Sequence, residues 1–423
     1  MMLSLLILNF FCLPESGGIA LTLKKPPEIP GLPSIDELAQ RGGYQATNYE
    51  VITEDGYSLW IHRIGNNTGP PVLMQHGLFL AADSWITRGS SKKDLAFMLL
   101  DLGYDVWLSN QRGTFFNQYS LKYHKTDPPF WDFSFHESGY YDLPAFIDKI
   151  LAVRNVQQIF FIGHSFGTVT YSVMCATRPE YNDKIKAAVL MSPVVYQRAS
   201  NQTSPIMSTL ATVRDFVTAN AFGRSANIVV GARSPASVQA LKVLCGSKSP
   251  TQGLCLSIFG LFVGENRINL NLDDFSTFVL YASSTSLRTL IHAAQNRLAD
   301  QFQQFDFGPK ENLMRYNSLK PPKYLLELVT TPTALFWSLN DPTLNEQSVA
   351  RFASEIPNVI TNSVVDDPKF SHADMIIGDN ANVILYPRII EILDSFSLDG
   401  GNADQFVIDE RVGGRMSSPT IVT

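Results

Sequence analysis

Apolar and polar positions alternate along the first half of the chain in a way that predicts strands separated by helices. Short apolar runs rich in β-branched and aromatic residues are typical of buried strands, and longer segments with a helical apolar period follow them. The predicted strands are 49–53, 58–64, 71–75, 104–108, 159–162 and 185–191. The predicted helices are 94–102, 141–153 and a segment that Arg178-Pro179 ends. This order predicts a mostly parallel sheet with ligand sites at its carboxyl edge.

The rhythm changes between about Val195 and Lys323 and then returns. Apolar helical segments with turn-rich breaks replace the strand runs, and they are predicted at 207–218, 236–244, 256–263, 275–282 and 287–297. We interpret residues 195–325 as a largely helical cap over the sheet edge, the alternative being additional helical core. Strands at 333–337 and 359–365, with helices at 345–356 and 381–396, resume the alternation. The predicted core is therefore 21–194 together with 326–398, and a polar, glycine-rich tail follows at 399–423.

One sequence at the end of a predicted strand has the form of a catalytic turn. The apolar run 159–162 leads into Gly163-His164-Ser165-Phe166-Gly167, and a helical pattern follows. G-x-S-x-G between a strand and a helix is typical of a nucleophile elbow, in which small residues allow a strained turn to expose the serine. The pattern predicts Ser165 as a nucleophile. The alternative is an ordinary serine in a glycine-rich turn.

A serine nucleophile on this architecture is followed along the chain by an acid and then by a histidine. Two histidines follow Ser165, namely His292 and His372. His292 lies in a predicted cap helix, where packing is the simpler role. His372 lies in a loop after a late predicted strand, so we predict it as the general base.

The acid is predicted from the same reasoning about strand ends. Asp341 directly follows the predicted strand 333–337 and would face the same edge as the elbow. The rival carboxylates lie so close to His372 in sequence that shaping its loop is the simpler role; they are Asp366, Asp367 and Asp374. We therefore predict Asp341 as the residue that orients the histidine.

Two backbone N–H groups are predicted to form an oxyanion hole. His76-Gly77-Leu78 ends an early predicted strand, where hydrolases of this architecture place a second donor. The N–H groups of Leu78 and Phe166 would then stabilise the charge that develops on a carbonyl oxygen. This chemistry needs no metal and no organic cofactor.

The composition is that of a globular protein. Of the 423 residues, 45% are hydrophobic and 17% are charged, which excludes a largely disordered chain. The net charge is −6 and no basic run occurs, so nucleic acid is not an expected partner.

The first residues predict export. Residues 1–20 contain an apolar block followed by small residues, as in a cleaved signal peptide, although no positive charge precedes the block. No later apolar stretch is long enough for a transmembrane segment. Asn66 and Asn201 begin glycosylation sequons, which agrees with export.

Three cysteines remain after the predicted signal peptide. Cys245 and Cys255 enclose a short loop of turn residues, and in an exported chain a disulfide between them is expected. Cys175 lies in the helix after the elbow and is expected to be a buried apolar residue.

Several of these sequences together resemble the acid lipase family, which includes gastric lipases, lysosomal acid lipases and insect relatives. The resemblance runs from about Ile35 to Phe396. It rests on VITEDGYSLWIHRI, QHGL, NQRGTFFNQYS, FWDFSFHESGYYDLPAFID, GHSFGT, TRPEYNDKI, ND at 340–341 and FSHADMIIG. The resemblance implies an α/β-hydrolase fold with a helical cap and lid, the same three triad positions, and hydrolysis of neutral-lipid esters after secretion or delivery to lysosomes. It also implies transient contact of the cap with a lipid interface.

Three departures from the family pattern concern substrate preference. Phe166 stands where the family usually has glutamine, and His136 stands where it usually has an acidic residue. The loop SLNDPTLN around Asp341 lacks the family's usual tryptophan. Two alternatives to a lipase therefore stay open: an esterase for smaller esters, and a catalytically silent protein that binds or stores lipid.

Overall fold

The computed structural model describes residues 25–197, 229–264, 266 and 268–398. The predicted signal peptide at 1–20, Asn201, the predicted helix at 207–218 and the tail at 399–423 lie outside the described residues. Within the described part, no helix is long and apolar enough to cross a membrane.

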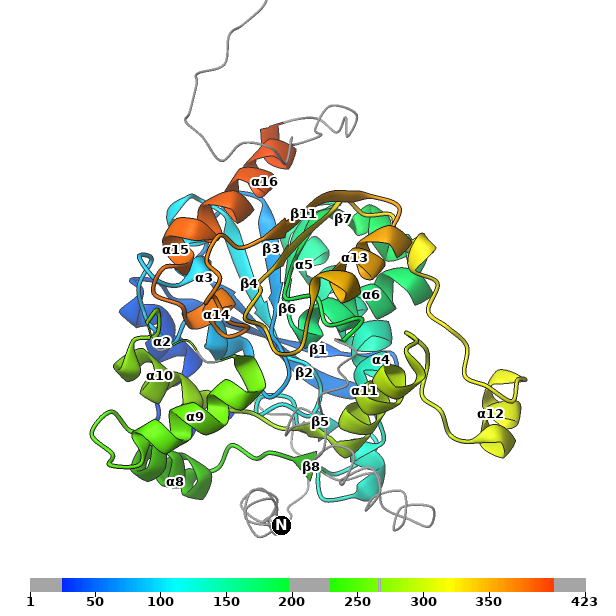
Figure 1. Ribbon diagram of the computed structural model, residues 1–423, viewed down its shortest axis with the longest axis horizontal. Helices are drawn as coiled ribbons and strands as arrows, with labels where there is room; N and C mark the ends of the chain where they lie inside the picture. The colour runs from blue at the N-terminus through cyan, green and yellow to red at the C-terminus, as the bar shows by residue number, and fades with distance from the viewer. Residues whose placement is uncertain (1–24, 198–228, 265, 267, 399–423) are drawn as a thin grey trace, which may run out of the picture.

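A single large sheet forms the centre of the molecule (Figure 1). Its strands lie in the order β1-β2-β4-β3-β6-β7-β10-β11, and the short strand β5 pairs with β2. All pairs from β4 to β11 are parallel, whereas β1, β2 and β5 run antiparallel to their neighbours. The strand bounds are β1 Ala46–Ile52, β2 Tyr57–Ile64, β3 Pro71–Gln75, β4 Asp105–Ser109, β5 Tyr119–Ser120, β6 Ile159–His164, β7 Ile185–Met191, β10 Thr333–Trp337 and β11 Val359–Val364.

Helices cover both faces of this sheet, because successive side chains of the buried strands point to opposite faces. On β3, Val72 and Met74 pack into one apolar core and Leu73 packs into the other. The first core is closed by α2 (Ile35–Arg41), α3 (Leu95–Asp101), α14 (Asp374–Ile377), α15 (Ala381–Ile384) and α16 (Tyr386–Leu398). The second is closed by α4 (Phe135–Glu137), α5 (Leu143–Arg154), α6 (Phe166–Thr177) and α13 (Glu346–Glu355). The predicted α/β class with a mostly parallel sheet is confirmed.

The element bounds agree closely with the pattern, with one clear exception. The predicted strands 71–75, 185–191 and 333–337 have the bounds of β3, β7 and β10. The single helix predicted at 381–396 is wrong, because the structure has the two helices α15 and α16 there. Pro387 explains the break, since its ring would collide with the carbonyl of Val383 in a continuous helix.

The segment between β7 and β10 lies over one end of the sheet and is mostly helical in its described part (Figure 1). Its helices are α8 Pro235–Cys245, α9 Gln252–Val263, α10 Leu272–Phe278, α11 Leu287–Ala299 and α12 Pro309–Tyr316. A two-stranded sheet, β8 (Val229–Val230) with β9 (Thr285–Ser286), adds to them. A disulfide joins Cys245 to Cys255 and so links the end of α8 to α9. We call this segment the cap.

A buried ion pair attaches the cap to the core. Arg233, just before α8, contacts both carboxylate oxygens of Asp83, which lies in the short helix Ala82–Trp85, and its Nη2 is 3.1 Å from Asp83 Oδ1. Both side chains are almost fully buried. The guanidinium also lies 4.8 Å from the centre of the Phe115 ring. Burial raises the pKa of Asp83, although Arg233 opposes this shift.

We expect Arg233→Met to destabilise the protein, because it leaves the Asp83 carboxylate buried without its partner. The loss at neutral pH should be about 3–5 kcal/mol in the free energy of unfolding. The folded variant should bind a proton at Asp83 more readily than the unfolded chain does, so part of the loss should return as the pH falls toward 5. Denaturant unfolding at the two pH values measures both effects. Arg315→Met is the control, since Arg315 forms an exposed pair with Glu311, and equal losses in the two variants would contradict the prediction.

Candidate active site

Ser165 occupies a strained turn between β6 and α6. Its φ is +54° and its ψ is −118°, a conformation that non-glycine residues rarely adopt. The turn is possible because residues two positions away are glycines. A Cβ atom on Gly167 would lie 2.4 Å from the carbonyl oxygen of Gln75 in β3, and one on Gly163 would lie 3.1 Å from the Gly167 carbonyl. The elbow therefore depends on close backbone contact at the carboxyl end of the sheet.

Asp341 and His372 lie together at the same sheet edge. Asp341 follows β10 and His372 follows β11, and Asp341 Oδ2 is 2.6 Å from His372 Nδ1. The other carboxylate oxygen accepts hydrogen bonds from the N–H and the hydroxyl of Thr343, at 2.8 and 2.5 Å. Burial alone would raise the pKa of Asp341, but His372 and Thr343 outweigh it and the pKa is lowered. An ionised Asp341 can hold His372 with its proton on Nδ1, which leaves Nε2 as the basic atom.

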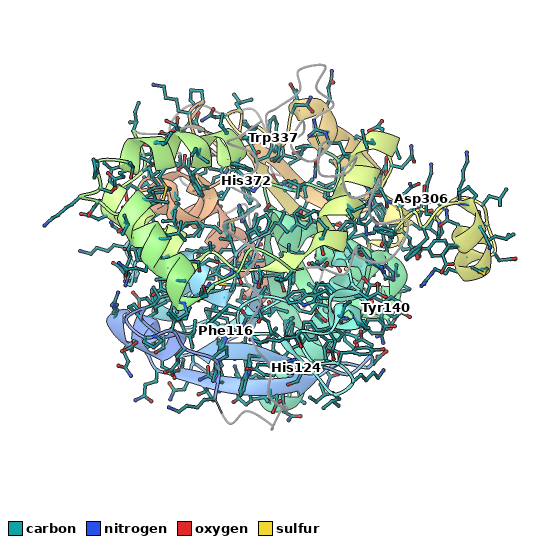
Figure 2. The ribbon with its side chains drawn as sticks, turned by 90° about the horizontal axis from the view of Figure 1, so that it is seen from below. Phe116, His124, Tyr140, Asp306, Trp337 and His372 are labelled. Carbon is teal, nitrogen blue, oxygen red and sulfur yellow. A yellow bond between two sulfur atoms is a disulfide. The ribbon has the colours of Figure 1, made fainter. Side chains whose placement is uncertain are left out.

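His164 links the histidine loop to the serine turn. Its Nε2 is 3.1 Å from the carbonyl oxygen of His372, and because a carbonyl only accepts, Nε2 carries the proton. The two imidazole rings are 4.8 Å apart between their centres (His372 is labelled in Figure 2). Burial first, and then the charge of His372, lower the pKa of His164 to about 3, so the ring is neutral. Among the described residues no hydrogen bond joins the Ser165 hydroxyl to His372, as is common before substrate binds.

The turn that carries the first predicted oxyanion donor is held against the serine. A Cβ atom on Gly77 would lie 3.0 Å from Ser165 Cβ, so residues 76–78 pass directly beside the nucleophile. His76 fixes this turn: its Nε2 accepts the N–H of Gln111 at 3.1 Å, and its Nδ1 then donates to the Gly77 carbonyl at 2.8 Å. Burial lowers the pKa of His76 to about 4, which keeps this arrangement neutral.

The Phe166 side chain lines a cavity beside the elbow, while its N–H begins α6 next to the serine. Phe135 meets Phe166 edge to face, with ring centres 6.1 Å apart. The apolar wall of this cavity also includes Val169, Val194, Ala293 and Phe302. The Phe166 side chain therefore forms part of the wall of a cavity that both apolar and polar side chains line.

The alternative histidine, His292, lies away from the predicted triad. It is buried in α11 with its ring stacked on Phe135 at 3.9 Å. Nδ1 contacts the Ser134 hydroxyl at 3.0 Å and Nε2 contacts the carbonyl of Gln303 at 2.8 Å. Burial lowers its pKa to about 3. These contacts agree with a packing role.

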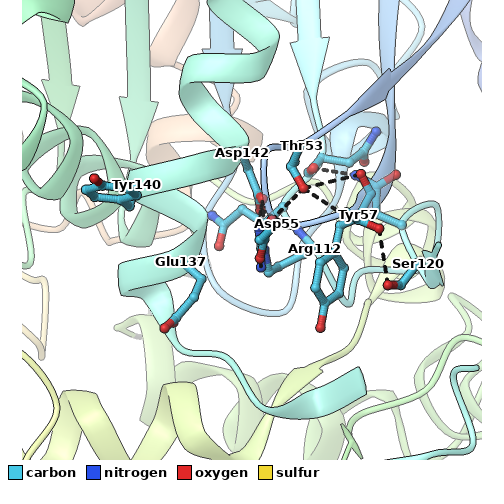
Figure 3. Close-up of polar contacts among 12 residues, drawn as sticks. Thr53, Asp55, Tyr57, Arg112, Ser120, Glu137, Tyr140 and Asp142 are labelled. Atoms are coloured by element: carbon cyan, nitrogen blue, oxygen red, sulfur yellow. Dashed lines mark hydrogen bonds and ion pairs between the residues drawn. The ribbon is translucent and has the colours of Figure 1, made fainter. Parts of the chain in front are cut away.

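A buried charge cluster that the motif analysis did not predict lies after β4 (Figure 3). The Arg112 guanidinium binds both oxygens of Asp55, at 2.6 and 3.0 Å, and contacts Asp142 at the start of α5 with Nε at 2.8 Å. The Tyr57 ring covers the guanidinium at 4.2 Å. No sequence signal pairs residues this far apart. The cluster holds the loop after β4 against the start of α5. Phe135, which lines the cavity, lies in α4 shortly before this end of α5.

His136, a second departure from the family pattern, is half-buried in the same region. Its ring lies between those of Tyr140 and Tyr324, and Nδ1 is 2.9 Å from the Tyr324 hydroxyl. Burial lowers the pKa of His136, so a neutral ring fits this position.

Comparison with known proteins agrees with this geometry. The family described as "alpha/beta hydrolase fold" matches residues 70–379, and "Partial alpha/beta-hydrolase lipase region" matches residues 35–89. Lipase 1 of Drosophila melanogaster is 32% identical over 366 residues, which are 85% of this chain and 79% of that protein. Gastric triacylglycerol lipase of Bos taurus is 31% identical over 370 residues, 85% of this chain and 91% of its own. Lipase member N of Mus musculus is 30% identical over 394 residues, 91% and 96% of the two chains.

The fold and the strained serine turn define an α/β hydrolase. Within that class the chain belongs to the acid lipase family, as the sequence resemblance predicts. It is a carboxylic-ester hydrolase.

We expect Gly77→Ala to lower turnover with little effect on folding. The added methyl would press on Ser165 Cβ at 3.0 Å and on His164 Nδ1 at 3.2 Å, so the backbone at residues 77–78 must move by a few tenths of an ångström. Loss of one oxyanion donor typically costs about 10²–10³ in rate, and a shifted donor should cost part of that. Steady-state kinetics on a soluble ester give the answer, with a thermal melt to confirm folding. Wild-type turnover in a folded variant would show that this backbone does not contact the transition state.

Proposed function

We propose that this protein is a lipase that hydrolyses esters of neutral lipids through Ser165, His372 and Asp341. The observation that carries the proposal is the 2.6 Å contact of Asp341 with His372 at the sheet edge where the strained Ser165 turn lies. The names of the relatives, gastric triacylglycerol lipase among them, support a lipid ester as the substrate.

The mechanism follows from these positions. Ser165 attacks the ester carbonyl while His372 Nε2 accepts the hydroxyl proton and then donates it to the departing alcohol. Asp341 keeps the imidazole in the required tautomer and stabilises its protonated form. The N–H groups of Leu78 and Phe166 stabilise the oxyanion. Water then attacks the acyl-enzyme, with His372 acting again as base and acid.

The lipid surface is proposed to meet the cap at α9. The helix has the sequence QGLCLSIFGLFV, which contains no charged residue. Leu254 and Leu261 are seven positions apart and therefore share a face, and their exposed fractions are 62% and 48%. Val243 and Leu244 of α8, across the disulfide, are exposed as well. An exposed apolar face without charges is typical of an interaction surface, and it suits adsorption to the surface of an ester emulsion.

Export or lysosomal delivery is proposed as the location. The disulfide between Cys245 and Cys255 agrees with an oxidising compartment. Asn66 of the first sequon is exposed, so a glycan can be attached to it without disturbing the core.

The test of the catalytic assignment compares short-chain and long-chain acyl esters at acidic and neutral pH. Ser165→Ala and His372→Ala should each lower kcat by at least about 10⁴-fold, because each removes a reacting group. Reaction of wild-type protein with a serine-directed phosphonate separates an enzyme from a silent lipid-binding protein. A preference for short chains would favour the esterase alternative. Hydrolysis that persists in folded Ser165→Ala would disprove the assignment.

The double variant Leu254→Ser, Leu261→Ser should impair action on emulsions selectively. Burying two leucine side chains in lipid contributes at least about 1.4 kcal/mol, so adsorption should weaken by roughly ten-fold or more. Hydrolysis of an emulsified long-chain ester should fall accordingly, while hydrolysis of a soluble ester stays unchanged. Val383→Ser is the matched control, because Val383 is 70% exposed on α15, outside the cap. Equal effects of the two changes would place the lipid contact elsewhere.

A further inference from the structure

The cap touches both loops that carry the proposed base and acid. It does so through the residues that follow α9, which we call the α9 linker; its described residues are Gly264, Asn266, Ile268 and Asn269. At the end of α9 itself, the Val263 carbonyl accepts the backbone N–H of His372 at 2.8 Å. The backbone of His372 is therefore hydrogen-bonded directly to the cap.

Gly264 brings the linker into direct contact with the residues before the acid and before the base. Its φ is +87°, and a Cβ atom there would lie 2.2 Å from the Asn340 carbonyl oxygen and 3.1 Å from Ser371 Cβ. Asn340 precedes Asp341, and Ser371 precedes His372. The close approach is possible because the residue is a glycine.

Asn266 contacts the histidine loop through Asp374, which lies two residues after His372. Its buried Nδ2 donates to Asp374 Oδ2 at 2.6 Å, and the same oxygen accepts the N–H of Ser371 at 2.7 Å. Its Oδ1 accepts the N–H groups of Ile268 and Asn269, which fixes the amide orientation. The bridge thus encloses His372 between Ser371 and Asp374.

Asn269 extends the attachment along the same loop. Its Nδ2 donates to Asp367 Oδ2 at 2.6 Å, and its carbonyl accepts the N–H of Asp379 at 2.8 Å. The contacts of Asn266 and Asn269 are not the sole attachment of the cap to the core among the described residues. Arg233 with Asp83, and Ser283 with the Phe79 carbonyl at 2.7 Å, attach it elsewhere.

We propose that the α9 linker positions His372, with Asn266 as the positioning residue. The inference rests on the proposed role of His372 as the base. Contacts from the cap to the His372 loop keep the imidazole at a fixed position relative to Ser165. A shift of the cap at α9 would therefore move His372 as well. The α9 helix, proposed above to meet lipid, is continuous with this linker, so the arrangement connects the lipid-facing helix to the proton-transfer group.

The test uses the full-length protein and a soluble short-chain ester, so that lipid adsorption does not enter. Asn266→Ala should lower kcat by about 10- to 100-fold with little change in KM, as expected when a reacting group is misplaced by a fraction of an ångström to about one ångström. The rate of phosphonate reaction at Ser165 should fall in parallel. Gln252→Ala is the matched control: Gln252 is also a buried cap amide, at the start of α9, but its Nε2 donates to the Ser276 hydroxyl and the Leu272 carbonyl within the cap. It should retain wild-type turnover.

A second variant gives a readout that loss of folding would not produce. Asn266→Asp places a carboxylate against Asp374, with Asp367 as a further nearby acid. Two adjacent carboxylates raise the pKa of one of them, so acidification restores an O–H donor in place of the amide N–H. The kcat of this variant, divided by that of wild type at the same pH, should be lowest at neutral pH and rise as the pH falls. Circular dichroism at each pH verifies that the chain is folded.

The outcomes separate the two proposals. If Asn266→Ala keeps wild-type kcat, or if Gln252→Ala loses as much as Asn266→Ala, the linker is not a positioning element. A ratio for Asn266→Asp that does not change with pH, in folded protein, also overturns the inference. If Ser165→Ala and His372→Ala retain activity, it is the proposed function that fails.

Discussion

The close approach of the Gly167 backbone to the end of β3 is the contact on which the serine half of the site depends. Residue 167 must be a glycine, because the Gln75 carbonyl oxygen occupies the place that a Cβ atom would need, and this close approach lets α6 begin immediately after Ser165. The strain at Ser165 persists because the neighbouring strands fix the turn. The Ser165 N–H donates to the carbonyl of Met191 at the end of β7, at 2.9 Å. The parallel sheet thus determines the position of Ser165.

Neutral histidines complete this half of the site. His76 and His164 are both buried beside the serine, and burial keeps the pKa of each well below its usual range. Each uses one ring nitrogen as a donor to a carbonyl, so each connects two backbone segments without adding a charge. A positively charged side chain at either position would oppose the protonation of His372 that the proposed mechanism requires. His76 and His164 therefore act as neutral hydrogen-bonding groups beside Ser165.

Sequence reasoning predicted the parts of the structure that local pattern determines. Strand bounds at β3, β7 and β10 follow from apolar runs ended by turn residues. The structure places Asp341 after β10 and His372 after β11, as the strand ends predict, while the catalytic roles of these residues stay a prediction. It did not predict contacts between distant residues. Arg233 with Asp83, and Arg112 with Asp55 and Asp142, join positions whose proximity only the fold defines. The break between α15 and α16 is different, because the sequence itself contains its cause. The steric effect of Pro387 outweighs the apolar period that predicts one continuous helix.

The two halves of the site are built on different supports. Ser165 lies between β6 and α6, and the two predicted oxyanion donors lie in the turn after β3 and at the start of α6, all within the core. The histidine side combines the β10 and β11 loops of the core with the end of α9 from the cap, through the Val263 carbonyl and Asn266. Under the positioning role proposed for the α9 linker, a change in the cap would act on the His372 loop, whereas the contacts that hold the Ser165 turn lie within the core.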